Sequence, residues 1–298
     1  MINVTELSHN QIIKKLYVVF TYLCAPIPDA VYLKIMYRIR TGEKLHLDNP
    51  KTFNEKTQWL KINDRKPIYT TMVDKYAVKK YVADIIGEEY VIPTLGVWDK
   101  FDDIDFDMLP EQFVLKCTHD SGGLIIVGDK SKLDIGTARK KINASMQRNY
   151  FYHGREWPYK KVKRRIIAET YMTDENKQIN DYKLFVFEGK VKCIQVDYDR
   201  FANHRRNFYD PKWNYMPFTT LYKTDPTHYI EKPECLEELI LCAERIAEAL
   251  GSLHFVRVDF YIISNRIYFG EITFYHGNGF EEFRPVEYDR KLGDWMVL

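Results

Sequence analysis

The sequence predicts an α+β protein whose sheets are largely antiparallel. Three observations support this fold class. Apolar residues recur at helical spacing in the first third of the chain, short β-rich segments follow from Tyr90 onward, and strand-like segments come in pairs separated by single helices. The 298 residues are enough for one elaborate domain or two smaller lobes.

Four helices are expected before Tyr90. Ser8 with Gln11 forms a capping-box pattern, and Pro28 suits a first helical turn. Within each segment apolar residues return every three or four positions, which places them on one face. The expected helices cover residues 8–23, 28–42, 52–62 and 74–86, and glycines end the second and the fourth.

Eight strands are expected after Tyr90, because β-branched and aromatic residues concentrate there in short runs bounded by turn residues. The expected strands are 91–94, 113–117, 124–127, 165–171, 182–187, 191–196, 255–263 and 267–274. Two helices interrupt them, at 137–149 and 235–250.

Composition indicates an ordinary soluble globular protein, with 45% hydrophobic and 29% charged residues. Lysine and arginine number 44 and aspartate and glutamate 42, so the charge balance gives no reason to expect a nucleic-acid partner. The five cysteines form no CxxC pair and are odd in number, which favours reduced thiols in the cytoplasm. The apolar run 16–27 is shorter than the about 20 residues that span a bilayer, although peripheral contact at the inner face of the membrane stays open.

The strongest local signal is the pair of strands VRVDFYIISNRIYFGEITF, at residues 256–274. Successive side chains of a strand point to opposite faces, so the register of the pair decides which carboxylates meet. A two-residue turn at 264–265 would place Asp259 across from Gly270, whereas an odd loop places it across from Glu271. We expect the second register, because it keeps one face wholly apolar.

Asp259 and Glu271 directly across a ladder lie about 4.5–5.5 Å apart at Cβ and repel each other, so they need a compensating cation. Mg²⁺ meets this need, since it takes one or two carboxylates and leaves its other positions to substrate phosphates. Arg257, on the same face as Asp259, offers the alternative of an ordinary arginine–carboxylate pair at a sheet edge.

A second signal is FVLKCTHDSGGLIIV, in which a polar loop separates two strands. Adjacent Gly122 and Gly123 let the backbone approach a ligand, and successive amides there can form an anion-binding nest. Ser121 adds a hydroxyl, and Lys116 adds a positive charge for a phosphate. The alternative is an ordinary hairpin turn with a solvated lysine.

Two weaker signals lie between these. The strand RRIIAETYM ends in Glu169 and Tyr171, where backbone groups can meet a flat heterocycle, and Asp181 in DYKLFVF can accept from ribose hydroxyls. The alternative is a core strand with a capping carboxylate. The cationic stretch 200–207, which contains Arg205, either neutralises a transferred phosphoryl group or is a solvated basic loop.

Taken in the order of the chain, the motifs resemble the ATP-grasp superfamily over residues 70–280. The closer resemblance, from about residue 30 onward, is to the TupA-like family of teichuronopeptide biosynthesis, through FNEKTQWLK, HDSG, REWPYK, DYKLFVF and GEITFYHGNGF. It implies an ATP-grasp fold, in which two α+β lobes with antiparallel sheets grip ATP. We therefore expect a helical region over 1–89, a subdomain with the phosphate loop over 90–175, and a subdomain with the metal site over 176–298.

The resemblance implies a ligase that phosphorylates a carboxylate with ATP and Mg²⁺ and joins it to an amine. Because the family usually accompanies bacterial surface-polysaccharide genes, the carboxylate is expected to belong to a uronic acid of a capsule or cell-wall glycan, and the amine to an amino acid or small amino compound. Two alternatives stay open. Asp197-Tyr198-Asp199 looks like a metal motif of glycosyltransferases, and a kinase acting on a hydroxyl would keep the same fold.

The resemblance also assigns roles to individual residues. ATP is expected to contact Lys75, Lys116, Ser121, Gly122, Gly123, Glu169, Tyr171, Asp181 and Asn207. The expected metal ligands are Asp259, Glu271 and Thr273, the last standing where these ligases commonly carry asparagine. The expected catalytic residues are Arg257, Arg205 and Lys183.

Overall fold

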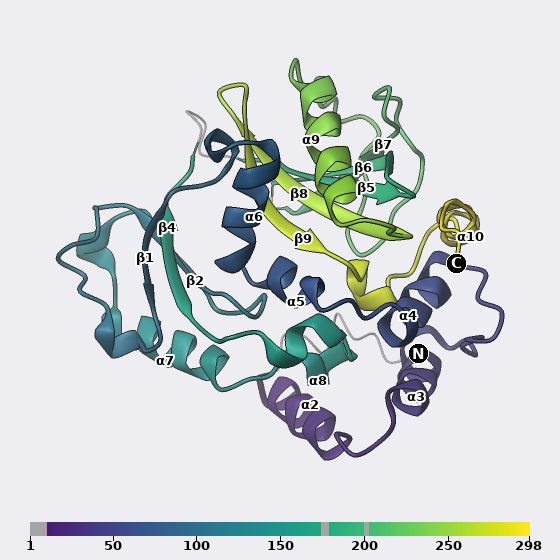
Figure 1. Cartoon of the computed structure of the whole chain (residues 1–298), viewed down its shortest axis with the longest axis horizontal. Coiled ribbons are helices and arrows are strands. Elements are labelled where there is room, and N and C mark those ends of the chain that lie inside the picture. Colours follow the sequence, from purple (N-terminus) through teal and green to yellow (C-terminus); the bar gives the residue numbers. More distant parts are fainter. Residues whose placement is uncertain (1–10, 174–178, 200–202) are drawn as a thin grey trace.

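The computed structural model describes residues 11–173, 179–199 and 203–298. Its strands form two antiparallel sheets, one of four strands and one of five, with helices packed against them (Figure 1). The predicted α+β fold with antiparallel sheets is confirmed. The strands of the smaller sheet lie between residues 94 and 170, and those of the larger sheet between 181 and 273.

The four-stranded sheet contains β1 (Thr94–Trp98), β2 (Phe113–Cys117), β3 (Leu124–Val127) and β4 (Ile166–Thr170), in the order β1-β4-β2-β3. Helix α7 (Ile135–Met146) packs against this sheet. Alternate residues of β2 are fully buried, and among them Phe113 and Leu115 share a small core with Ile142 of α7. This alternation is typical of a sheet that has one face on the core.

The five-stranded sheet contains β5 (Asp181–Phe187), β6 (Lys190–Tyr198), β7 (Arg205–Tyr209), β8 (Phe255–Ile263) and β9 (Arg266–Thr273), in the order β7-β6-β5-β8-β9. Helix α9 (Leu236–Ala249) packs on β5 and β6 and contacts α6 (Ala77–Ile86), which lies beside it in Figure 1. Every residue of the central strand β5 is buried, so both faces of this sheet are covered.

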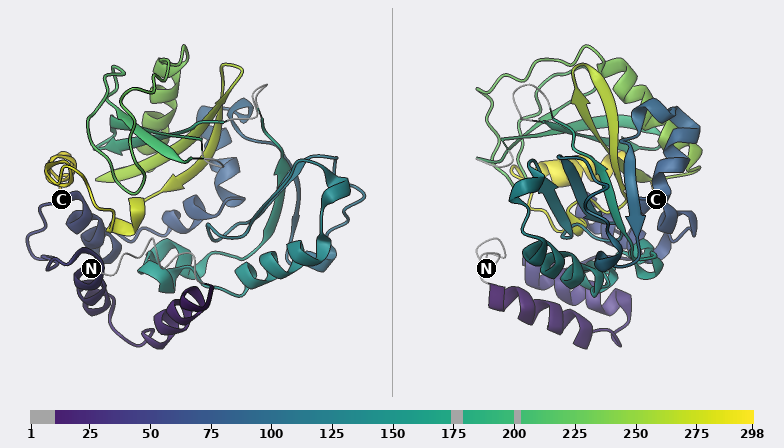
Figure 2. Two further views of the ribbon diagram at one scale, coloured as in Figure 1. Left: turned by 180° about the vertical axis from the view of Figure 1, so that it is seen from behind. Right: turned by 90° about the vertical axis from the view of Figure 1, so that its left-hand side faces the viewer.

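Further helices lie around the two sheets: α2 (Gln11–Leu23), α3 (Asp29–Thr41), α4 (Phe53–Asn63), α5 (Ile68–Val73) and α10 (Glu287–Trp295). Helix α4 begins with a capping box, in which the Thr52 side chain accepts from the Glu55 N–H and the Glu55 carboxylate accepts from the Thr52 N–H. Its first residue, Phe53, packs edge-on against Phe255 of β8, with ring centres 4.9 Å apart. Figure 2 shows α2 and α3 on the outside of the molecule, away from both sheets.

The segment 150–161 connects these outer helices to the sheets. It contains α8 (Phe151–Gly154) and the short helix η4 (Trp157–Lys161), separated by Arg155 in the left-handed conformation with φ 57°. Arg155 is 1% exposed, its Nη2 donates to the Cys24 carbonyl at 2.6 Å, and its guanidinium lies 4.4 Å from the ring centre of Tyr32. The backbone on either side of Arg155 is therefore fixed against α3 and the turn before it.

The β8–β9 hairpin has the predicted register but not the predicted loop. Asp259 lies opposite Glu271, as expected. The turn nevertheless has only two residues, Ser264 and Asn265, both with positive φ (49° and 58°), as in a type I′ turn. Gly270 is an extra residue in β9, a β-bulge that shifts the register by one position. The bulge lets Phe269 pair with the buried Phe260 while Glu271 still faces Asp259.

Several elements differ from the prediction. The expected strand 91–94 is replaced by β1, which begins at Thr94, because Pro93 has no N–H to donate to a ladder. The expected helix 74–86 begins at Ala77, whose N–H donates to the Asp74 carboxylate. Helices α5, α8 and α10 and strand β7 are additional. Ser8 of the expected capping box lies outside the described residues.

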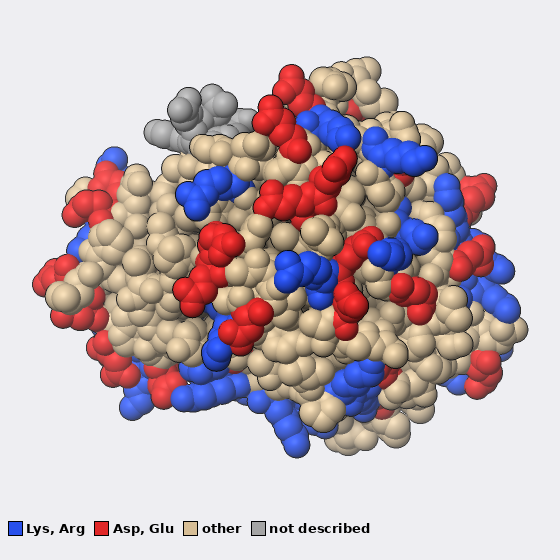
Figure 3. Space-filling view, turned by 45° about the horizontal axis from the view of Figure 1, so that its top comes forward, with Lys and Arg blue, Asp and Glu red and all other residues tan. Residues whose placement is uncertain are grey.

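The cysteines are buried, and the surface charges of the described residues show no concentration of one sign on the face drawn. All five cysteines are buried and free. Within the described ranges, no helix has the length and apolar character needed to cross a membrane. Basic and acidic side chains are interspersed over the face shown in Figure 3.

Candidate active site

Charged side chains gather on one face of the five-stranded sheet, and apolar ones such as Leu184 and Val258 occupy the other. Paired positions on antiparallel strands share a face, and the register pairs Asp259 with both Lys183 and Glu271. The charged face therefore draws on all five strands: Asp181 and Lys183 from β5, Asp197 from β6, Arg206 from β7, Arg257 and Asp259 from β8, and Glu271 from β9.

Arg257 joins the two opposed carboxylates. Its Nε donates to Asp259 Oδ1 at 2.6 Å and its Nη2 to Asp259 Oδ2 at 2.7 Å, while Nη2 also lies 3.2 Å from Glu271 Oε1. Burial raises the pKa of Asp259, but Arg257 and Lys183 lower it more, and the net shift is downward. The aspartate is therefore held as a carboxylate between two cations.

Lys183 lies at the centre of the charged face. Its Nζ is 3.0 Å from both Asp181 Oδ2 and Asp259 Oδ2, and 3.9 Å from Asp197 Oδ2. Burial lowers the pKa of Lys183, but Asp259 and Asp181 outweigh it and the net shift is upward. The lysine stays protonated and keeps three buried carboxylates together.

A second arm closes this network into a ring. Arg206 Nε donates to Asp197 Oδ1 at 2.7 Å, and Arg206 Nη1 donates to Glu281 Oε2 at 3.2 Å. His276 accepts from Arg257 Nη1 at its Nδ1 (2.9 Å), so its Nε2 carries the hydrogen and donates to Glu281 at 3.2 Å. The ring fixes the guanidinium of Arg257 from behind, which preorganises the groups that face the other sheet.

The loop between β2 and β3 is shaped from within by Asp120. This buried carboxylate accepts from the N–H groups of Gly122 (3.3 Å) and Gly123 (3.0 Å) through Oδ1 and from Ser145 Oγ through Oδ2. The two expected phosphate-binding amides are therefore engaged inside the loop. Ser121 is exposed, with its Oγ 3.5 Å from the Tyr150 hydroxyl.

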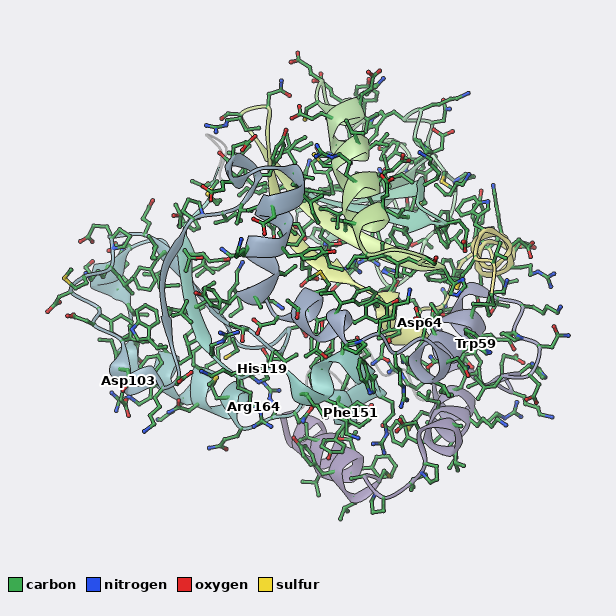
Figure 4. The ribbon with its side chains drawn as sticks, in the orientation of Figure 1. Trp59, Asp64, Asp103, His119, Phe151 and Arg164 are labelled. Atoms are coloured by element: carbon green, nitrogen blue, oxygen red, sulfur yellow. The ribbon has the colours of Figure 1, made fainter. Side chains whose placement is uncertain are left out.

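Lys75 connects the β2–β3 loop to the five-stranded sheet. Its Nζ donates to the Asp120 carbonyl of the loop at 2.9 Å and lies 3.6 Å from Glu271 Oε2 of β9. Its backbone N–H also donates to the Thr118 carbonyl at 3.0 Å. The expected phosphate loop and the expected metal-binding strand therefore meet at one lysine. His119, labelled in Figure 4, marks this loop.

Lys116 and Glu169 lie on the same face of the four-stranded sheet. Lys116 Nζ lies 2.5 Å from Glu169 Oε2, and Lys79 of α6 binds the other oxygen. Burial raises the pKa of Glu169, whereas Lys116 and Lys79 lower it, and the net shift is downward. These two residues, both expected at ATP, pair with each other across β2 and β4.

Arg205 and Asn207 do not join the charged face. They alternate with Arg206 along β7, so their side chains leave the sheet on the opposite face. The Asn207 amide donates to the Asp225 carbonyl at 3.0 Å and its Oδ1 accepts from Thr224 Oγ1 at 2.8 Å, which holds segment 224–228. The two residues expected at phosphate therefore lie on the face of β7 opposite the charged face, because the face of β7 depends on its pairing with β6.

The remaining expected residues lie at the edges. Thr273 shares the face of Glu271, opposite Arg257. Tyr171 follows β4 and borders a shallow hollow with Gly128 and Asp129, away from the charged face. Arg200, in the expected cationic stretch, lies outside the described residues.

The charged face fits a magnesium ion shared with phosphate. Among the described residues, no group of three or more histidine, cysteine, aspartate or glutamate side chains is placed to hold a metal. Glu271 is the accessible carboxylate, 39% exposed, whereas Asp259 is 7% exposed and already binds two cations. Mg²⁺ that uses one or two carboxylates and completes its shell with phosphate oxygens suits this donor set.

Sequence reasoning missed Lys79, His276 and Glu281, and it included Arg206 only as part of the cationic stretch 200–207. Lys79 follows Lys75 by one helical turn, a spacing that could have suggested a shared face. Glu281 and His276 carry no local signal, since their roles depend on Arg206 and Arg257 from distant strands. Asp197 was singled out only as a metal motif, and its carboxylate instead binds Arg206 and lies near Lys183.

Comparison with known proteins gives one family match. The family model described as TupA-like ATP-grasp matches residues 55–297. No match emerges among curated protein sequences. Similar solved structures include the D-alanine–D-alanine ligase of Bacillus anthracis with ATP (16% identity, 76% of this chain and 68% of that one, TM-score 0.41). They also include the L-amino acid ligase of Bacillus licheniformis (16% identity, 76% of this chain and 49% of that one, TM-score 0.44). A third is an N5-carboxyaminoimidazole ribonucleotide synthetase with ADP (14% identity, 74% of this chain and 50% of that one, TM-score 0.46). The chain thus spans about half the length of these last two.

Proposed function

Because the chain belongs to the TupA-like ATP-grasp family, we propose that it is an ADP-forming carbon–nitrogen ligase, which joins a carboxylate to an amine through an acyl phosphate. ATP phosphorylates the carboxylate, the amine attacks the acyl carbon, and the carbon–oxygen bond to phosphate breaks. The family assignment supports this class of reaction, and the geometry of the charged face supports its site.

The contact made by Lys75 carries the proposal. One ammonium group reaches both Asp120 of the β2–β3 loop and Glu271 of the larger sheet. A nucleotide bound between the two sheets would therefore meet Lys75 and Lys116 on one side and Arg257 on the other. Converging cations of this kind stabilise a phosphoryl group during transfer, because its negative charge spreads over several oxygens.

The side chains would divide the work by position. Lys75 and Lys116 bind phosphate oxygens, and Arg257, held by Asp259, offsets charge on the transferred group and the acyl oxygen. Lys183 holds the Asp181 and Asp259 carboxylates in place. Glu271 and Asp259 would hold Mg²⁺, which would neutralise negative charge on the phosphate groups. Most of the rate enhancement then comes from orientation and electrostatics rather than from covalent chemistry by the protein.

We further propose that the carboxylate is a uronic acid of a bacterial surface polysaccharide. The family's link to surface-polysaccharide synthesis supports this choice. The amine co-substrate would be an amino acid or a small amino compound. A cytoplasmic protein that touches the inner face of the membrane suits a lipid-linked glycan, and exposed apolar residues on α2 and α3 support such contact.

Oxygen-18 transfer tests the proposed function. Glucuronate and galacturonate labelled in the carboxylate are incubated with Mg·ATP and a panel of amino acids, and the released phosphate is analysed by mass spectrometry. The proposal requires label in the phosphate, together with ADP, and its loss in the Asp259→Asn/Glu271→Gln variant. A stable phosphomonoester would show a kinase instead, and the absence of ADP release with every pair would overturn the uronic-acid assignment.

A further inference from the structure

A buried carboxylate without a partner lies next to the charged face. Glu156 sits between α8 and η4, is 6% exposed, and is fixed by its neighbour Arg155. Among the described residues, no side chain or backbone group donates a hydrogen bond to its carboxylate or forms an ion pair with it. Its oxygens are not among the unpartnered atoms sealed from solvent, so a ligand can reach them, and an accessible carboxylate held in a buried position suits a cationic ligand.

The nearest ammonium group is already occupied. Lys61 of α4 donates to Gln58 Oε1 at 3.0 Å, to the Asn278 carbonyl at 2.8 Å and to Asn278 Oδ1. An ammonium has three hydrogens, and these three acceptors use them all. Lys61 therefore lends its charge to this region without bonding Glu156. Burial raises the pKa of Glu156 more than Lys61 and Arg257 lower it, Glu271 adds to the rise, and the net shift is upward.

The same surroundings place Glu156 beside the reacting groups. Tyr150 and Tyr159, which are half-buried and meet edge-on with ring centres 4.8 Å apart, border this position, and burial together with Glu156 raises the pKa of each. The Tyr150 hydroxyl also lies near Ser121 of the loop, and the negative charge of Glu271 raises the pKa of both tyrosines. A chain of contacts therefore leads from Glu156, whose carbonyl accepts from the Tyr159 N–H, through Tyr159 and Tyr150 to Ser121 of the phosphate loop.

Further unpartnered polar atoms lie on the side of Lys61. The hydroxyl of Tyr275 and Nδ2 of Asn278 are buried without a hydrogen-bond partner. Figure 4 shows the surrounding elements: Phe151 marks α8, and Asp64 marks the end of α4. One acceptor, Glu156, and two donors, Tyr275 and Asn278, are complementary to a zwitterion that carries an ammonium and a carboxylate.

We propose that Glu156 binds the ammonium group of the amine co-substrate, and that this co-substrate is an amino acid. The inference rests on the proposed ligase function and adds the second substrate and its binding residue. A cation is favoured over an anion, because Glu156 and Glu271 both repel a carboxylate, while the faces of Tyr150 and Tyr159 attract an ammonium.

Ligand binding tests the inference without turnover. Saturation-transfer NMR is recorded for a panel of proteinogenic amino acids, with the protein held with Mg²⁺ and a non-hydrolysable ATP analogue. At least one amino acid should bind the wild type, and Glu156→Gln should weaken it about 10- to 100-fold, the loss expected for a charge-assisted hydrogen bond. The matched control is Asp289→Asn, which alters another buried carboxylate, bonded to Asn54, and should leave binding unchanged.

Two outcomes overturn the inference: no amino acid binds the wild type, or Glu156→Gln binds as tightly as the wild type. If Glu156→Gln does not fold, Glu156→Asp keeps the charge, withdraws the carboxylate by one methylene, and should weaken binding in the same direction. Hydroxylamine separates the two proposals, because it traps an acyl phosphate without an ammonium site. Hydroxamate formed at wild-type rates by Glu156→Gln supports both, and amino acid binding without hydroxamate from any uronate overturns only the proposed function.

Discussion

Arg257 holds Asp259 with two parallel hydrogen bonds, at 2.6 and 2.7 Å, and the same guanidinium lies 3.2 Å from Glu271. One planar cation therefore neutralises two carboxylates that the β-bulge at Gly270 brings face to face. Lysine carries a point charge and cannot reproduce this forked geometry.

Arg257→Lys should therefore lower kcat for ADP release by about 10²–10³-fold, the usual cost of losing a donor aimed at developing charge. The measurement is a coupled ADP assay at saturating ATP. Arg284→Lys is the control, since Arg284 pairs with Glu282 at the exposed surface, where such pairs contribute little. An Arg257→Lys enzyme with wild-type kcat would remove Arg257 from the mechanism.

Gly123→Ala should destabilise the phosphate loop. A Cβ at this position would meet Cys117 Sγ and would lie 2.6 Å from Ser145 Oγ, both inside the packed core under the loop. Overpacking of this kind costs about 1–3 kcal/mol in the free energy of unfolding, and the KM for ATP should rise as the loop shifts. Urea unfolding measures the first effect and steady-state kinetics the second. Gly128→Ala, where nothing lies within 4 Å, should change neither.

The Glu169 ion pairs make the free energy of unfolding depend on pH in the acidic range. Burial raises the pKa of Glu169, Lys116 and Lys79 lower it, and the net shift is downward. A carboxylate with a depressed folded-state pKa stabilises the protein fully above its unfolded pKa of about 4.3, and this contribution is lost as pH falls through the lower folded value. Wild-type unfolding free energy should therefore fall below about pH 4.3, and Glu169→Gln should show a flatter curve. Glu237→Gln, in the first turn of α9, should follow the wild type.

The hairpin β8–β9 shows how far sequence pattern reaches. Asp259 was placed opposite Glu271 because that register keeps Val258 and Ile272 on one apolar face, and burial enforces such a pattern. The predicted odd loop was wrong, because a period-two pattern shows which face each side chain takes and does not reveal a β-bulge. Gly270 satisfies both the tight turn and the apolar face at once.

Other site residues could not be predicted from local sequence. Arg206 and Arg205 are neighbours, and only pairing of β7 with β6 decides that Arg206 meets Asp197. Five-residue strands such as β7 give too little pattern to assign a face. Lys79, Glu281 and Glu156 acquire their roles from elements far away in the chain, so their environments exist only in the folded protein.

The outer face of α2 and α3 should bind anionic membranes. Leu23, Ile35 and Ile39 are 74%, 45% and 57% exposed there, with the basic side chains of Lys34 and Arg38 between them. The one acidic residue between positions 17 and 41, Asp29, is paired with Arg65 at 2.6 Å. Exposed apolar residues flanked by basic ones are typical of helices that lie in a membrane interface.

Ile35→Glu/Ile39→Glu should therefore reduce binding to phosphatidylglycerol-containing vesicles by at least about tenfold, since each isoleucine loses about 1.5–3 kcal/mol of apolar burial. Co-sedimentation measures the binding, and vesicles of phosphatidylcholine alone should bind the wild type weakly, because they lack the negative charge that attracts Lys34. Leu241→Glu, at an exposed position of α9, is the control and should leave binding intact. Equal binding of the double variant and the wild type would mean that another surface meets the lipid, whereas no binding by either would assign this face to a protein partner or a second copy of the chain.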